Sequence, residues 1–215
     1  MDKATTRKLT SRTDADDPNG GNACWETPPE VFAKLNLDFG PFDLDMTADA
    51  SNHLLPDWVG PGSLVGHHDI LALLELVNID GAGILKTSGY SNPIYDYKFI
   101  NALIPLCALA ARKKGFASTL LLPLRTTSEW WNWLITNQHN EEGAAVVAFC
   151  DSRIYFYEQG QPRWNAKELA KGKYRPDSAV FDSVIINFTA EEHPSTCFTS
   201  WIVPPHVPTI HREVL

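Results

Sequence analysis

The sequence of 215 residues lacks paired cysteines and long apolar runs. Its four cysteines are far apart, and none stands in a Cys-x-x-Cys pair or beside a cluster of histidines. This spacing argues against a zinc site, and the apolar runs around Cys107 and Cys150 predict buried thiols in a reducing compartment. No apolar run approaches the ~20 residues of a membrane span and no signal peptide is recognisable, so we expect a cytoplasmic protein without membrane attachment.

An excess of positive charge is also absent. The chain carries 18 Lys and Arg residues against 26 Asp and Glu residues, a formal net charge of −8. Any contact with nucleic acid therefore has to come from local patches. The length predicts one domain over residues 23–203, with a polar, disordered N-terminal tail over 1–22 and an extended C-terminal tail over 204–215. The sequence does not indicate an oligomeric state.

The most informative stretch is Ser91-Asn92-Pro93-Ile94-Tyr95-Asp96, which follows an expected strand and precedes an apolar helix pattern. The side-chain oxygen of Asn92 and the backbone carbonyl of Pro93 can accept two hydrogen bonds, and Tyr95 offers an aromatic face. Two acceptors and a stacking surface suit the exocyclic amino group of a flat heterocycle, such as N6 of adenine. The alternative is an ordinary Asn-Pro turn with Tyr95 packed on the core.

Two segments near the N-terminus predict further parts of a pocket. Thr27 and Glu30 have capping-box spacing, with Pro28 at the first helical position, so Trp25 and the start of a helix could line a ligand site. Residues 41–48 are typical of a strand that ends in an acidic turn of small residues. Ligands of doubly wound α/β domains bind at the carboxyl ends of strands, where Asp45, Thr47 and Ala48 would lie. Alternatively, Trp25 packs beneath the helix and Asp45 caps a turn.

The middle of the chain indicates a helix or loop over residues 70–81 and a strand near 83–86. Asp69 could place an acid near a bound heterocycle, whereas the adjacent His67 and His68 are poor metal ligands. Pro105 interrupts the next helix pattern, which predicts a kink or two shorter helices over 98–111. The basic triplet before Gly115 is interpreted as a helix end rather than a DNA contact.

The residues that follow are expected to form one side of the candidate ligand site. A buried strand over 118–123 leads into a loop with Arg125 and a helix with a second capping-box spacing, Thr126 to Glu129. At least two of the tryptophans at 130, 131 and 133 are expected to belong to the core. Further strands are expected over 144–150 and 153–157, and a final core strand over 178–188.

Segment 151–178 is locally basic, with six Lys and Arg residues against four Asp and Glu residues. Aromatic residues are interleaved with these charges, which suits phosphate contact and base stacking, although a solvated loop explains the pattern equally well. The candidate DNA-binding residues are Arg125, Arg153, Arg163, Lys171, Lys173 and Arg175.

The order of these motifs resembles the phage N6-adenine DNA methyltransferase family, the small Dam-type enzymes of phages and prophages. The resemblance covers about residues 24–188 and departs from the Asn-Pro-Pro-Tyr signature at Ile94. It rests on Trp25-x-Thr27-Pro28, Phe42-Asp43-Leu44-Asp45-x-x-Ala48 with Asn52, Asp69-x-Leu71, Asn92-Pro93-Ile94-Tyr95, Leu121-Leu122-Pro123-x-Arg125-Thr126, Arg153-Ile154-x-Phe156 and Ser178-Ala179-Val180.

The resemblance implies a class I, Rossmann-like α/β fold with a mixed, mostly parallel sheet flanked by helices. It also implies that the chain methylates adenine N6 in double-stranded DNA with S-adenosyl-L-methionine as cofactor and without a metal. The implied cofactor-binding residues are Trp25, Thr27, Asp45, Ala48, Asp69 and Asn92. The residues implied to hold the target base are Asn92, Pro93 and Tyr95. Two alternatives are cytosine-N4 methylation and a catalytically silent relative that binds the cofactor or a protein partner.

Overall fold

The computed structural model describes residues 25–60, 87–138, 144–158, 160–162, 166–173, 179, 181–189 and 195–206. Several of the expectations above concern residues outside this part of the chain. They are the tail over 1–22, Asp69, the segments 70–81 and 83–86, Arg163, Arg175 and the end of the C-terminal tail. These remain predictions.

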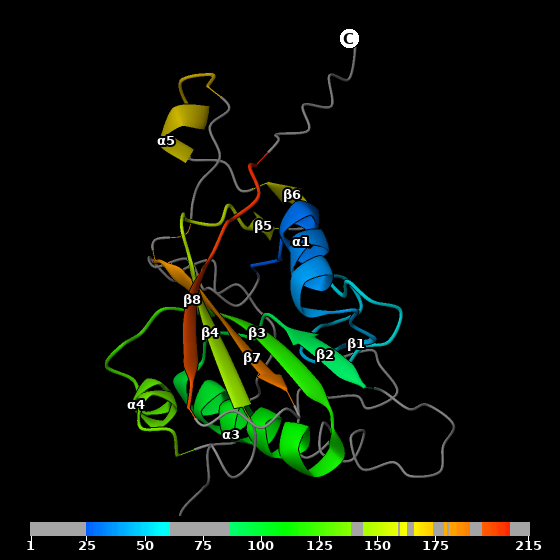
Figure 1. The fold of residues 1–215 in the computed structure, drawn as a ribbon. Helices are drawn as coiled ribbons and strands as arrows, with labels where there is room; N and C mark the ends of the chain where they lie inside the picture. The colour runs from blue at the N-terminus through cyan, green and yellow to red at the C-terminus, as the bar shows by residue number, and fades with distance from the viewer. Residues whose placement is uncertain are drawn as a thin grey trace, which may run out of the picture.

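Six strands form one mixed sheet in the order β1-β2-β3-β7-β4-β8 (Figure 1). The strands are β1 (Leu44–Asp45), β2 (Ser88–Ser91), β3 (Ala117–Pro123), β7 (Ser183–Thr189), β4 (Ala144–Cys150) and β8 (Cys197–Trp201). Strand β7 runs antiparallel to its neighbours β3 and β4, and the other strand pairs are parallel. Five strands therefore point in one direction. The expected α/β fold with a mostly parallel mixed sheet is confirmed, and it is compatible with a Rossmann-like fold.

Helices cover both faces of the sheet. Helices α3 (Tyr97–Lys114) and α4 (Glu129–Ile135) lie on one face, and α1 (Pro29–Phe39) lies on the other (Figure 1). A small hairpin of β5 (Tyr157–Glu158) and β6 (Gln161–Pro162) lies beside the start of α1, and the short α5 (Ala166–Leu169) follows it. None of the helices in the described ranges is long and apolar enough to cross a membrane.

The core is divided by the sheet into two clusters, because side chains of successive strand residues point to opposite faces. Leu120 and Leu122 of β3 belong to the cluster under α3 and α4, whereas Leu121 belongs to the cluster under α1. All three side chains have no exposed surface. Trp130 and Trp131 are buried, as expected, and Trp133 packs against the core from a partly exposed position.

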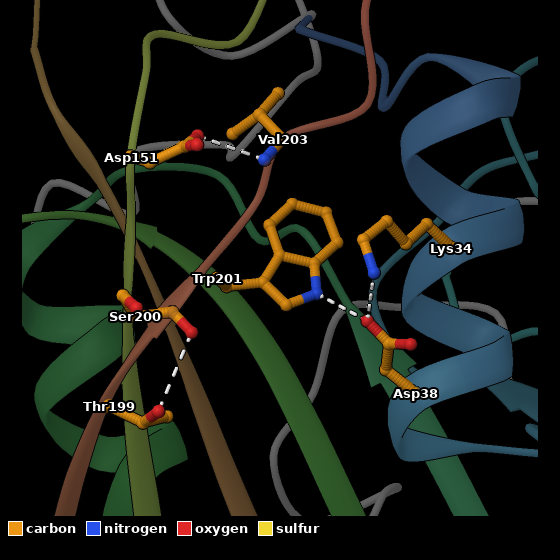
Figure 2. Close-up of polar contacts among 7 residues, drawn as sticks. All are labelled: Lys34, Asp38, Asp151, Thr199, Ser200, Trp201 and Val203. Carbon is orange, nitrogen blue, oxygen red and sulfur yellow. Dashed lines mark hydrogen bonds and ion pairs between the residues drawn. The ribbon is translucent and has the colours of Figure 1, made fainter.

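The end of β8 is fastened to α1 by polar contacts (Figure 2). Trp201 Nε1 donates a hydrogen bond to Asp38 Oδ2 at 2.7 Å, and Lys34 Nζ contacts the same oxygen at 2.6 Å. Beyond the strand, the backbone N–H of Val203 donates to Asp151 Oδ1 at 3.0 Å. The bonds to Asp38 join the last strand of the sheet to the first helix of the described chain, and the bond to Asp151 joins the segment after β8 to the end of β4.

Two expectations about helix caps are wrong, and so is the alternative of two shorter helices at Pro105. Thr27 does not cap α1, because its hydroxyl bonds to Tyr90, and the helix begins at Pro29 with Pro28 at the N-cap position and no side-chain cap. Ser128, not Thr126, caps α4. Helix α3 continues through Pro105, which lies on the exposed side of the helix. The expected end of α3 is confirmed, because the helix stops at Lys114 and Gly115 follows with a φ of 68°, a backbone conformation that favours glycine.

The strand boundaries also differ from expectation. Of the strand expected over residues 41–48, only Leu44–Asp45 forms. Of the strand expected over 153–157, only the last residue belongs to a strand, β5. The strand expected over 178–188 begins at Ser183 and is not the last, because β8 follows it. Cys107 is buried as expected, whereas Cys150 is half-buried, and burial raises the pKa of both thiols to about 12.

Candidate active site

The central motif lies where two parallel strands end. Strand β2 ends at Ser91, so Asn92 and Pro93 leave the sheet at its carboxyl edge. Strand β1 pairs with β2 in parallel, with Asp45 opposite Tyr90, so Asp45 reaches the same edge. The ends of adjacent parallel strands are the usual ligand-binding position in α/β sheets. The structure thus brings together two motifs that are separated by more than 40 residues in sequence.

A pocket opens to solvent at this edge, and its empty space, open solvent included, is about 250 Å³. The pocket is lined by Trp25, Glu26, Thr27, Asp45, Thr47, Ala48, Asn52, Leu54, Tyr90 and Asn92. Each sequence-derived cofactor residue that lies in the described part of the chain is among them.

The Asn92 amide has a defined orientation. Its Nδ2 donates a hydrogen bond to the backbone carbonyl of Trp25 at 2.8 Å, and its Oδ1 accepts one from the Tyr95 hydroxyl at 2.8 Å. A backbone carbonyl can only accept, so the amide nitrogen must face Trp25. The oxygen keeps a second lone pair, which can accept a further hydrogen bond.

Asp45 is a buried carboxylate in the pocket wall. Its side chain is 4% exposed, and Oδ2 accepts a hydrogen bond from the backbone N–H of Leu54 at 3.0 Å. Burial raises the pKa of Asp45 to about 6, against the lowering effect of backbone hydrogen bonds from Leu54 and Thr47 and of nearby His53. At pH 7 the group is mainly ionised, and it can accept hydrogen bonds or attract a cation.

Two hydroxyl pairs join the pocket wall to β2. Thr27 Oγ1 and the Tyr90 hydroxyl are 2.6 Å apart, and Thr47 Oγ1 and Ser91 Oγ are also 2.6 Å apart. Burial raises the pKa of Tyr90, so the phenol remains neutral. Each pair satisfies two buried polar groups, which would otherwise destabilise the fold.

An aromatic cluster adjoins the Asn92 end of the pocket. The Trp25 ring stacks on Phe156 and Phe181, with ring centroids 5.4 and 5.1 Å away. Tyr95 meets Trp25 and Phe181 edge-on, at 6.4 and 5.3 Å. These contacts hold the Tyr95 ring beside the pocket, with its hydroxyl on Asn92.

Comparison with models of known families gives a match. A sequence model described as DNA N-6-adenine-methyltransferase (Dam) matches residues 15–183, more than half of the chain. The chain belongs to the Dam family. The resemblance expected from the motifs is thereby confirmed at the family level, and the family is one of DNA N6-adenine methyltransferases. No curated protein and no solved structure matches the chain.

Four of the basic residues expected to contact DNA lie in the described ranges of this Dam-family chain, and none of the four lines the pocket. Arg125 is exposed and follows β3, so it lies at the same edge of the sheet as Asn92. Arg153 is exposed and its Nε lies 3.3 Å from Asp182, and Lys171 pairs with Glu168 at 2.8 Å. Lys173 is exposed just after α5. Among the described residues there is no cluster of side chains that could hold a metal ion.

Sequence reasoning missed three pocket residues: Glu26, Leu54 and Tyr90. Tyr90 stands two residues before Asn92 in a strand, so its side chain and that of Asn92 could be expected on one face. For Glu26 and Leu54 no local pattern distinguishes a pocket position from a surface position.

Proposed function

We propose that this Dam-family chain transfers a methyl group from S-adenosylmethionine to N6 of an adenine flipped out of duplex DNA. The observation that supports this most is the position of Asn92. Its oriented amide lies between the pocket that contains Asp45 and the aromatic ring of Tyr95. A methyl donor on one side and a flat base on the other would meet at this amide.

The residues of the pocket fit the proposed cofactor. Asp45 offers a buried carboxylate to an ammonium or a ribose hydroxyl, and Trp25 and Leu54 offer apolar surface to a purine ring. Thr27 and Ala48 line the remaining wall, and Asp69 stays a prediction. When bound, S-adenosylmethionine supplies an electrophilic methyl group on a sulfonium centre.

Asn92 and Pro93 would prepare the target nitrogen by holding its two hydrogens. Adenine N6 is a weak nucleophile because its lone pair is conjugated with the ring. Hydrogen bonds from N6 to Asn92 Oδ1 and to the Pro93 carbonyl favour a pyramidal amine with its lone pair directed at the pocket. Tyr95 stacks on the flipped base and offsets part of the cost of unstacking it, a few kcal/mol. The reaction then depends on alignment, without a general base.

DNA would be held by local positive charge, since the chain as a whole is acidic. We propose phosphate contacts from Arg125, Arg153, Lys171 and Lys173, with Arg163 and Arg175 as further predictions. Replacing any one of them by Ala should weaken DNA binding similarly for all sequences and reduce its salt dependence.

The deciding experiment measures N6-methyladenine by nucleoside mass spectrometry in plasmid DNA from a host that lacks its own adenine methylase. The wild-type chain should produce the modified base, and Asn92→Ala should reduce the rate of transfer by at least ~10²-fold, as when a group preorganised for the transition state is lost. Asn132→Ala, an exposed position on α4, is the matched control and should behave as wild type.

The other outcomes separate the alternatives. N4-methylcytosine in place of N6-methyladenine would replace the proposed substrate. If the folded protein binds S-adenosylmethionine in calorimetry but modifies no base, it is a silent or partner-dependent relative. In that case Ile94→Pro, which restores the family signature, is the first variant to assay.

A further inference from the structure

The tripeptide Trp25-Glu26-Thr27, which we call the pocket strand, pairs with the β5–β6 hairpin. The backbone N–H and carbonyl of Glu26 exchange hydrogen bonds with those of Tyr157, both at 2.9 Å. The Glu26 side chain adds a third bond, because Oε2 accepts from the backbone N–H of Gly160 at 2.8 Å. Gly160 has φ of 71°, so the turn presents this N–H from a backbone conformation that favours glycine.

The other side of the pocket strand meets the reactive motif. The carbonyl of Trp25 accepts from Asn92 Nδ2 at 2.8 Å, and this bond sets which end of the amide faces the target base. The Thr27 hydroxyl bonds to Tyr90 in β2. A shift of the pocket strand therefore moves the carbonyl on which the orientation of Asn92 depends.

We propose that Glu26 is a positioning residue for Asn92. Its side chain fastens the hairpin turn to the pocket strand and so holds the Trp25 carbonyl in register with the Asn92 amide. This role rests on the proposed function of Asn92. It requires a side chain long enough to reach Gly160 with an acceptor oxygen, whereas a negative charge is not required.

The position of Glu26 offers two other roles against which this one can be tested. Its side chain lines the pocket and is half-buried, so it could contact the cofactor through its charge. It could also serve only the stability of the hairpin. A cofactor contact predicts dependence on charge, and a purely structural role predicts loss of stability without a selective loss of turnover.

Three substitutions separate these roles. Glu26→Gln keeps the length and the acceptor, Glu26→Asp keeps the charge but is one methylene too short, and Glu26→Ala removes both. If Glu26 is a positioning residue, Glu26→Gln should retain kcat within ~3-fold of wild type. Glu26→Asp and Glu26→Ala should lower kcat by about 10–100-fold, since small misplacements of a reacting group have effects of this size. The loss should fall mainly on kcat, and KM for DNA should change little, because the orientation of the Asn92 amide acts in the transition state rather than in ground-state binding.

Glu129→Ala is the control. It removes one carboxylate from the start of α4, where Glu129 bonds to Asn101, and should leave kcat unchanged. Because Glu26→Ala could fail to fold, the comparison of Asp with Gln decides the outcome by itself.

A second measurement uses the protein without cofactor or DNA. The Asn92 side-chain NH₂ signals in the ¹⁵N NMR spectrum, assigned by their loss in Asn92→Ala, report the bond to Trp25 through their hydrogen exchange. We expect slow exchange in wild type and Glu26→Gln, and exchange faster by ~10-fold or more in Glu26→Asp, because a lost hydrogen bond of about 1.4 kcal/mol corresponds to that factor. If the wild type methylates no DNA, the proposed function fails, but this exchange measurement still tests the positioning.

Two results would overturn the proposal. Lower activity and a raised Kd for S-adenosylmethionine in Glu26→Gln, with both retained in Glu26→Asp, would assign Glu26 to the cofactor. Wild-type kcat and slow Asn92 exchange in Glu26→Asp would show that the hairpin bond does not reach the amide.

Discussion

The β1–β2 edge and the β3–β7–β4 centre of the sheet differ in length and composition. Strands β1 and β2 have two and four residues and include the buried polar side chains of Asp45, Ser88 and Ser91. Strands β3, β7 and β4 have seven residues each, and Leu120–Leu122 and Val184–Ile186 have no exposed surface. The contrast teaches that the long apolar strands form the core, whereas the candidate site is built on short strands that carry polar groups.

The polar edge is nevertheless tightly organised. The hydroxyls of Thr27, Tyr90, Thr47 and Ser91 are paired with one another, and both ends of the Asn92 amide are bonded. Its groups are held in place by hydrogen bonds, which contribute little net stability but strongly fix direction. Substitutions at the edge should therefore affect function more than stability, and substitutions at the centre should do the reverse.

The largest effect on stability is expected from Ile186→Ala in β7. This side chain has no exposed surface and lies opposite Leu120 and Val147 in the neighbouring strands. The free energy of unfolding should fall by about 3 kcal/mol, within the range for cavity-forming core substitutions, while kcat per folded molecule stays near wild type. Urea unfolding and methylation assays measure the two quantities. A large loss of kcat in the folded variant would contradict the division between centre and edge.

A somewhat smaller effect, now on activity, is expected from Tyr95→Ala. Loss of the stacking face should cost about 1–3 kcal/mol in transfer to the flipped base, the usual value for a base–aromatic stack. Tyr95→Phe should retain most activity, although it lacks the hydroxyl that bonds to Asn92. Single-turnover methylation of a short duplex is the measurement. Equal rates for Tyr95→Ala and wild type would rule out a stacking role.

Asp45 should make cofactor binding dependent on pH. Its pKa of about 6 lies above the ordinary value, so binding that requires the carboxylate weakens as pH falls through 6, by roughly tenfold per pH unit. Calorimetry between pH 5 and 8 should show this slope in wild type and its absence in Asp45→Asn.

The effect of the Asp45 carboxyl on folding stability has the opposite dependence on pH. The folded state binds the Asp45 proton more tightly than the unfolded state, so this group's contribution to stability is present at low pH and is lost as pH rises through about 4 to 6. Asp45→Asn should therefore be at least as stable as wild type at pH 7, while it binds the cofactor less tightly. Lower stability at pH 7 would contradict the burial argument.

The smallest effect is expected from Trp201→Phe, which removes the side-chain hydrogen bond between β8 and α1 (Figure 2). Burial raises the pKa of Asp38, but hydrogen bonds from Lys34 and Trp201 outweigh it and lower the pKa below its usual value. Losing the Trp201 bond should reduce the free energy of unfolding by ~1 kcal/mol at pH 7. The difference should shrink as pH falls through the lowered pKa, because protonated Asp38 no longer gains from the bond. Methylation activity should stay unchanged.

The sequence alone determined the elements whose patterns are local. The apolar runs of β3 and β4 predicted strands, and the glycine after the basic triplet predicted the end of α3. A strand does precede Asn92, but it is β2, which includes Ser91, a residue that we expected to follow the strand. Each of these depends on neighbours along the chain, where periodicity and turn chemistry act directly. The motif order also led to the Dam family.

Tertiary structure decided which distant groups meet. Thr27 has capping spacing, yet its hydroxyl bonds to Tyr90, 63 residues away, because a buried phenol requires a hydrogen-bond partner. Glu26 reaches Gly160 across 134 residues, and no local pattern encodes that pairing. Strand β8 was missed because its first four residues are exposed and show no buried face, and it forms by pairing with β4. Such contacts depend on how the strands assemble, so the sequence shows the parts of the site and the fold sets their arrangement.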